Sequence, residues 1–290
     1  MEFLGASVDE VSPGRCVLRI PHKAELDQHE GDFHGGAIAI LADTAVGYAA
    51  FSLAPAEASI LTVEFKINYL TGARGEYLVA EGEVIRAGKS LTVCEGRVYS
   101  ETEGQRSHCA VILGTLMYLP GRADTQHVRR PATQRRSIYQ TESTRLQVQP
   151  ATDDFADHVA GVLARQPFPS GLGLQLENVE PGYSVCRVPH RADLTQQHGF
   201  FHGGMVATIA DTAMGAAAGS LVPRGSTPLT AEFKLNLMAP GDGRSLRAYG
   251  YVVRPGRTLS ICRADVTTLD AEGTEYLCAS AMGTLVPVAY

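Results

Sequence analysis

Two short clusters in this sequence have residue types and spacings that could carry out chemistry. Each contains a His-Gly-Gly and an Asp nine residues after the His: His34, Gly35, Gly36 and Asp43, and His202, Gly203, Gly204 and Asp211. Glycines at a helix N-terminus let a ligand approach free backbone N–H groups, where the helix dipole favours negative charge. Such donors could stabilise a developing oxyanion.

Both aspartates stand in apolar, helix-forming surroundings, directly after Ala42 and Ala210. A carboxylate in such a place is costly unless it is paired or takes part in chemistry. Each Asp lies roughly 10 Å along the helix axis from its own His-Gly-Gly, by the rise per residue. We therefore expect each Asp to serve the helix N-terminus of the other cluster. A buried Asp43 satisfied by the hydroxyl of Thr44 or Thr62 is the alternative, and a structural role is the simplest interpretation of His34 alone.

The two clusters belong to one internal repeat, the feature to be sought first in any sequence. Residues 21–70 and 189–238 align without a gap at a constant offset of 168 and are identical at 27 of 50 positions. Two such long units exclude a solenoid. Duplication of a self-complementary domain predicts a pseudo-dimer with facing helices and a joined sheet. We predict domains at 1–119 and 154–290, separated by a linker over 120–153.

The expected fold of each copy is α+β, an antiparallel sheet wrapped around one central helix. The helix of the first copy, 35–53, is apolar on most faces and should be buried nearly all round. Turn residues separate the β-rich runs, and short connections between consecutive strands favour antiparallel pairing. The expected strands are 16–20, 59–69, 76–86, 90–100 and 108–119. A further helix, 155–165, is expected ahead of the second copy only.

Composition narrows the possible functions. The formal net charge of −6 argues against general binding of nucleic acid or of anionic membranes. Six scattered cysteines predict buried free thiols in a reducing compartment. We find no signal peptide and no segment long enough to span a bilayer, so we expect a cytoplasmic protein. No metal site is expected, and the absence of G-x-S-x-G argues against a serine hydrolase.

Three stretches in each copy resemble the PaaI-type hotdog-fold acyl-CoA thioesterases, in a tandem arrangement. They are Gly31–Asp43, Leu61–Leu70 and Arg86–Leu91 in the first copy, and Gly199–Asp211, Leu229–Met238 and Arg254–Leu259 in the second. The resemblance spans nearly all of both copies and excludes the linker. It implies hydrolysis of acyl-CoA at the interface between two hotdog domains, with no cofactor, because CoA is part of the substrate.

The resemblance also assigns roles to individual residues. The N–H groups of Gly35 and Gly203 would bind the thioester carbonyl, and Asp43 and Asp211 would activate water, assisted by Thr62 and Thr230. Gln28 and Gln196 stand where many relatives have Asn, which adds a methylene to the amide side chain. The expected CoA-binding turns are Gly88-Lys89-Ser90 and Gly256-Arg257-Thr258, although ordinary hairpin turns are the alternative.

Two mixed sites follow from these assignments. One should combine Gln28, His34 and Gly35 with Asp211 and Thr230, and the other Gln196, His202 and Gly203 with Asp43 and Thr62. We expect both to be chemically competent but to prefer different acyl groups, because Tyr48 aligns with Ala216 and Phe51 with Gly219. We also expect chains to pair as a homodimer. A non-catalytic acyl-CoA sensor and a hotdog dehydratase are the alternative functions.

Overall fold

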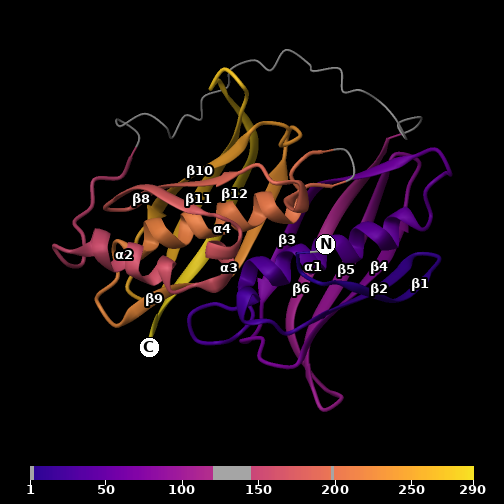
Figure 1. Ribbon diagram of the computed structural model, residues 1–290, viewed down its shortest axis with the longest axis horizontal. Helices are drawn as coiled ribbons and strands as arrows, with labels where there is room; N and C mark the ends of the chain where they lie inside the picture. The colour runs from indigo at the N-terminus through magenta and orange to yellow at the C-terminus, as the bar shows by residue number, and fades with distance from the viewer. Residues whose placement is uncertain (1–2, 120–144, 197–198) are drawn as a thin grey trace.

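The computed structural model describes residues 3–119, 145–196 and 199–290. Figure 1 shows two similar halves in which a central helix lies against a sheet. The first repeat contains β1 (Ser7–Ser12), β2 (Arg15–Pro21), the 3-10 helix η1 (Ala24–Leu26), α1 (Gly35–Phe51), β3 (Ser59–Tyr69), β4 (Tyr77–Ala87), β5 (Leu91–Thr102) and β6 (Gln105–Leu119). The second contains α2 (Phe155–Ala164), α3 (Pro167–Gly171), β7 (Gln175–Glu180), β8 (Tyr183–Pro189), η4 (Ala192–Leu194), α4 (Gly203–Gly219), β9 (Ser226–Leu237), β10 (Ser245–Arg254), β11 (Ser260–Leu269) and β12 (Glu275–Ala289).

The predicted elements of the first repeat are all present, and β3 has the predicted bounds. The predicted helix 155–165 is observed as α2. The elements that were not predicted include β1, an almost fully exposed edge strand whose side chains show no apolar alternation. They also include its counterpart β7, the five-residue helix α3 and the short 3-10 helices η1 and η4. Most of the predicted linker, residues 120–144, lies outside the described residues.

Among the described residues, one sheet of twelve antiparallel strands runs through both repeats, in the order β1-β2-β4-β5-β6-β3-β9-β12-β11-β10-β8-β7. The halves join where β3 pairs with β9, and Lys66 lies opposite Lys234 at the centre of this register. Each of these lysines bonds to a glutamate of the other repeat, Lys66 to Glu232 at 3.0 Å and Lys234 to Glu64 at 3.1 Å. The expected joined sheet is therefore observed, and exchanged ion pairs offset the repulsion between its central lysines.

The two long helices lie on the sheet and contact each other. Most of α1 is buried, as its apolar sequence predicts, apart from Tyr48 and Phe51 near its end, which are exposed. In α4 the equivalent residues, Ala216 and Gly219, are buried as well. The helices cross where α1 and α4 begin. A Cβ on Gly204 would stand 2.6 Å from the Cα of Ile40, and a Cβ on Gly36 would stand 2.6 Å from the Thr208 side chain. Glycine is required at Gly204 because only hydrogen fits against the backbone there.

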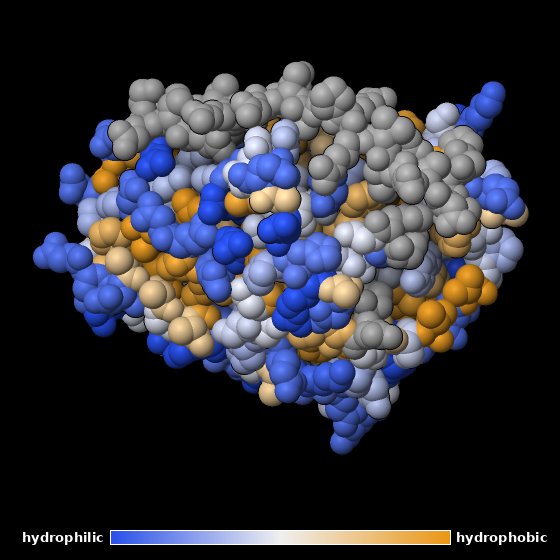
Figure 2. All heavy atoms as spheres, turned by 45° about the horizontal axis from the view of Figure 1, so that its top comes forward, coloured by the Kyte–Doolittle hydropathy of each residue, from blue (hydrophilic) through white to orange (hydrophobic). Residues whose placement is uncertain are grey.

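The second repeat carries α2 and α3 ahead of its first strand, and α2 packs beside α4. No described helix is long and apolar enough to span a membrane, and the face in Figure 2 is mostly hydrophilic, with hydrophobic residues in small groups. All six cysteines are buried and free, as predicted.

Candidate active site

A cavity of about 340 Å³ lies between the repeats. Residues from both repeats line it, and they include every member of one predicted mixed site: Gln28, His34, Gly35, Asp211 and Thr230. The first three come from the end of the β2–α1 connection and the start of α1, whereas Asp211 comes from α4 and Thr230 from β9. The fold thus places the N-terminus of one central helix opposite the carboxylate of the other.

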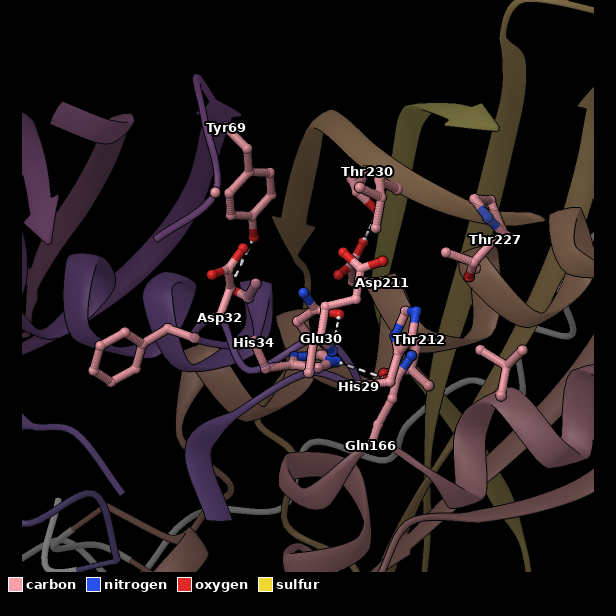
Figure 3. Close-up of a pocket in the computed structure, with 18 of the residues that line it drawn as sticks. His29, Glu30, Asp32, His34, Tyr69, Gln166, Asp211, Thr212, Thr227 and Thr230 are labelled. Carbon is pink, nitrogen blue, oxygen red and sulfur yellow. Dashed lines mark hydrogen bonds between the residues drawn. The ribbon is translucent and has the colours of Figure 1, made fainter. Parts of the chain in front are cut away.

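The Asp211 carboxylate is 8% exposed, and its Oδ1 accepts a hydrogen bond of 2.6 Å from the Thr230 hydroxyl (Figure 3). Burial raises the pKa of Asp211 to about 6, although the Thr230 bond lowers it. Near neutral pH the side chain is therefore mostly an anion with little solvation, in a place that a ligand can reach. These are the properties of a general base with a tuned pKa.

The His34 ring is fixed as a neutral tautomer. His34 is the N-cap of α1, and its Nδ1 accepts the N–H of Gly36 at 2.9 Å. Its Nε2–H therefore donates to Oε1 of Gln166, at 3.1 Å (Figure 3). Burial lowers the pKa of His34 to about 4. Gly36 N–H is taken, and the first N–H groups of a helix lack intrahelical acceptors. Gly35, the first residue of α1, lines the cavity and can offer its N–H to a ligand there.

The two glycines of the His-Gly-Gly motif have different roles in this geometry. Gly35 lines the cavity. The sequence pattern alone had suggested that Gly35 and Gly36 both give a ligand access to backbone N–H groups. Gly36 and Gly204 instead lie in the crossing between α1 and α4. The motif combines one ligand-facing position with one packing position, a distinction that spacing alone could not reveal.

Among the cavity-lining residues that the sequence patterns did not single out, Tyr69, Gln166 and His29 lie at the catalytic end. Tyr69 donates its hydroxyl to the Gly35 carbonyl at 2.9 Å, and the equivalent position of the second repeat is Leu237. Gln166 holds His34 and stands at the N-cap of α3. Both ring nitrogens of His29 are buried without a hydrogen-bond partner among the described residues. In the sequence, the feature that could have identified Tyr69 as a site residue is its replacement by Leu237 in the otherwise similar second repeat.

Four described members of the other predicted set, Asp43, Thr62, His202 and Gly203, are also brought together and pack against one another. The Asp43 carboxylate is 2% exposed; it accepts a bond of 2.8 Å from Thr62 and lies 3.5 Å from Nδ1 of His202. A Cβ on Gly203 would stand 3.0 Å from Oδ2 of Asp43. The nearest described cavity, of about 20 Å³, reaches His202 but not Asp43, Gly203, Thr62 or Gln196. Burial raises the pKa of Asp43, and the His202 charge opposes this.

The alternative interpretation of Asp43 is partly correct. Thr62 does satisfy one carboxylate oxygen, whereas Thr44 uses its hydroxyl on the carbonyl of Ile40 instead. The same bond occurs between Thr230 and Asp211. A threonine bond is therefore common to both aspartates, and the open cavity is what distinguishes Asp211.

The predicted CoA-binding turns do not line the cavity. Gly88, Lys89 and Ser90 join β4 to β5, and Gly256, Arg257 and Thr258 join β10 to β11; all six residues are exposed. The register relates the second turn to the cavity, because Leu285 of β12 pairs with Ser260, at the start of β11, on one side and with Thr230 of β9 on the other.

Each repeat is a helix enclosed by an antiparallel sheet, and this arrangement, present twice in one chain, is a tandem hotdog fold. Between the repeats a helix N-terminus and a buried carboxylate line the same cavity, as in a hydrolase-type site. A family model described as the thioesterase superfamily matches residues 30–107 and 198–274, more than half of the sequence. The chain belongs to the thioesterase superfamily, as the sequence resemblance indicated.

Individual relatives agree with this membership. A Halobacterium salinarum protein provisionally named an esterase is 42% identical over 100 residues, which are 33% of this chain and 66% of the relative. The 1,4-dihydroxy-2-naphthoyl-CoA hydrolase of Listeria monocytogenes is 28% identical over 102 residues, 35% of this chain and 83% of the relative. A crystal structure from Novosphingobium aromaticivorans, provisionally described as a thioesterase, matches with a TM-score of 0.58 at 15% identity, covering 96% of this chain and 97% of that one. This last similarity shows the tandem fold alone.

Proposed function

We propose that the protein hydrolyses acyl-CoA thioesters to a free acid and CoA, in the cavity lined by Gly35 and Asp211. The observation that carries this proposal is the meeting of a free helix N–H and a buried carboxylate across one accessible cavity. The named activity of the Listeria relative, a CoA hydrolase, supports the substrate class.

In the proposed mechanism Asp211 accepts a proton from water while the water oxygen adds to the thioester carbonyl. Thr230, bonded to Oδ1, leaves Oδ2 of Asp211 for the water. The Gly35 N–H stabilises the oxyanion, aided by the α1 dipole. Collapse of the tetrahedral intermediate breaks the C–S bond, and the leaving CoA thiolate takes up the proton held by Asp211, which restores the base. No cofactor takes part in any of these steps.

We also propose that the repeats form a pseudo-dimer in which turnover is centred on this one site. The Asp43 carboxylate already occupies the space beside Gly203 and His202 where a thioester oxygen would bind at the other site. This proposal differs from the sequence-based expectation that both sites are chemically competent and prefer different acyl groups. Arg257, on its exposed turn, remains our candidate for a CoA phosphate contact, and pairing of chains as a homodimer remains a prediction for solution mass measurement.

The pH dependence provides a specific prediction. Because burial raises the pKa of Asp211 to about 6, kcat/KM should rise as pH increases through about 6 and then level off, since only the ionised base activates water. The pH–rate profile is measured with one acyl-CoA that saturates the enzyme. The residual activity of Asp211→Asn should not show the increase in rate around pH 6. A rate that is flat from mildly acid to neutral pH would contradict this assignment.

Release of free CoA from a panel of acyl-CoA thioesters tests the function itself. Hydrolysis of any member above the uncatalysed rate supports the proposal. Tight binding of acyl-CoA without release would instead indicate a sensor, and formation of enoyl-CoA from 3-hydroxyacyl-CoA would indicate a dehydratase. Either of these results without CoA release overturns the proposed function.

A further inference from the structure

One part of the cavity is not needed to bind a thioester carbonyl. Beyond Asp211 the cavity continues along α4, past Thr212, Gly215, Ala216 and Gly219. These residues are spaced three or four apart, so they share one face of the helix. From Asp211 to Gly219 this face is about 12 Å long, by the rise per residue. Thr212 uses its hydroxyl on the carbonyl of Thr208, so the floor presents mainly small or apolar groups.

Two other elements form walls along this floor. On one side β9 contributes Thr227, Pro228 and Leu229. On the other side α2 contributes mainly apolar side chains: His158, Val159, Val162 and Leu163. The His158 ring lies 3.1 Å from the carbonyl of Ser226, which ties α2 to the start of β9. Floor and walls together make a groove, which we name the α2–α4 groove.

The groove is closed at its far end. A Cβ on Gly219 would stand 3.3 Å from Val159 and 3.9 Å from Pro228, so α4, α2 and β9 converge there. The open end meets the Asp211–Thr230 pair. A ligand entering past these groups would therefore run along α4 and stop near Gly219.

Gly215 keeps the middle of the groove open. It lies in the interior of α4, where glycine lowers helix stability relative to alanine. Its conformation is helical, and a Cβ added to it would meet nothing within 4 Å. Neither packing nor backbone geometry therefore requires glycine here. A vacant volume above Gly215, inside the cavity, is what glycine preserves.

The first repeat does not build this groove. No described segment of that repeat corresponds to α2, and the positions equivalent to Ala216 and Gly219 are Tyr48 and Phe51, whose large side chains are exposed. Among the described residues, the small side chains of α4 thus occur together with α2, which precedes the second repeat.

We propose that the α2–α4 groove binds the hydrocarbon part of a medium-chain acyl group, with Gly215 and the Gly219 end limiting its length. This inference rests on the proposed function. An extended chain gains about 1.2 Å per bond, so a groove of about 12 Å accommodates about eight to ten carbon atoms. Octanoyl and decanoyl thioesters should be preferred, and palmitoyl thioesters should be poor substrates because the closed end excludes them.

The test compares Gly215→Leu with Gly47→Leu. Gly47 is the equivalent interior glycine of α1, a Cβ there also meets nothing within 4 Å, and it does not line the cavity. Leucine is the better helix former at both positions, so both variants should remain folded. We expect Gly215→Leu to lower the ratio of kcat/KM for decanoyl-CoA to that for butanoyl-CoA about tenfold or more, since a filled pocket excludes chain methylenes. Gly47→Leu should leave this ratio unchanged.

Several outcomes would overturn the groove while leaving the proposed function intact. These are an unaltered ratio in Gly215→Leu, the same shift in Gly47→Leu, or efficient turnover of palmitoyl-CoA by the wild-type protein. A preference for compact aromatic thioesters over every linear chain would likewise overturn the medium-chain assignment. If no thioester is hydrolysed, the proposed function fails. Calorimetric binding of the non-hydrolysable thioether decyl-CoA then still tests the groove, because Gly215→Leu must weaken the binding of decyl-CoA and Gly47→Leu must not.

Discussion

Replacement of Asp211 by Asn is expected to lower kcat about 100-fold or more, the usual scale for loss of a general base. Asparagine keeps the size of the side chain and can still accept the Thr230 bond, but it cannot take a proton from water. The equivalent variant Asp43→Asn is the matched control, because Asp43 has the same threonine bond and lies outside the cavity. Asp43→Asn should keep most of the wild-type kcat.

The stability of Asp211→Asn should separate a catalytic from a structural role. The pKa of Asp211 is about 6 in the folded protein, against about 3.9 in an unfolded chain. The folded state thus binds this proton more tightly, and the resulting stabilisation is fully present below about pH 4 and lost as pH rises through about 6. Under mildly alkaline conditions the uncharged Asn should therefore raise the melting temperature or leave it unchanged.

Two results would contradict the proposed use of one site. If Asp43→Asn loses as much activity as Asp211→Asn, both mixed sites turn over substrate. If Asp211→Asn keeps the full rate and unfolds more easily, Asp211 is a structural residue and another group activates the water.

The second large effect is expected at the crossing of the two central helices. Gly204→Ala should lower the unfolding free energy by about 1–3 kcal/mol, the usual cost of overpacking, because the new Cβ would stand 2.6 Å from the Cα of Ile40. Backbone cannot move aside as a flexible side chain can. Gly36→Ala meets the Thr208 side chain and the Phe168 ring instead, so its cost should be smaller.

Thermal unfolding of a small series measures this effect. The control is Gly47→Ala, an interior position of α1 with open space above it, which should stabilise the protein by up to about 1 kcal/mol through helix propensity. Replacement of glycine by alanine is thus expected to lower the unfolding free energy at Gly204 and to raise it at Gly47. Equal effects at Gly204 and Gly47 would show that helix packing does not depend on the glycine.

The sequence by itself determined the fold of each repeat. The apolar, proline-free run at 35–53 and the β-rich runs separated by turn residues predict α1 and the sheet, and α1 ends two residues earlier than predicted, at Phe51. The 168-residue offset predicts that the halves are alike. The repeat also predicts that each site contains residues of both repeats, because Asp43 lies too far along its helix from the His-Gly-Gly of the same repeat.

Only the tertiary structure decided which mixed site is open. Both clusters have the same residue types and spacing, and the difference arises from α2, a segment outside the aligned repeat that packs beside α4 and lines one cavity. The contributions of Gln166 to His34 and of Tyr69 to Gly35 depend on contacts between segments distant in sequence. Local sequence patterns encode which face of an element is buried, but not what covers that face. For this reason the sequence predicted the chemistry of the site, whereas its accessibility and the length of its groove required the packed structure.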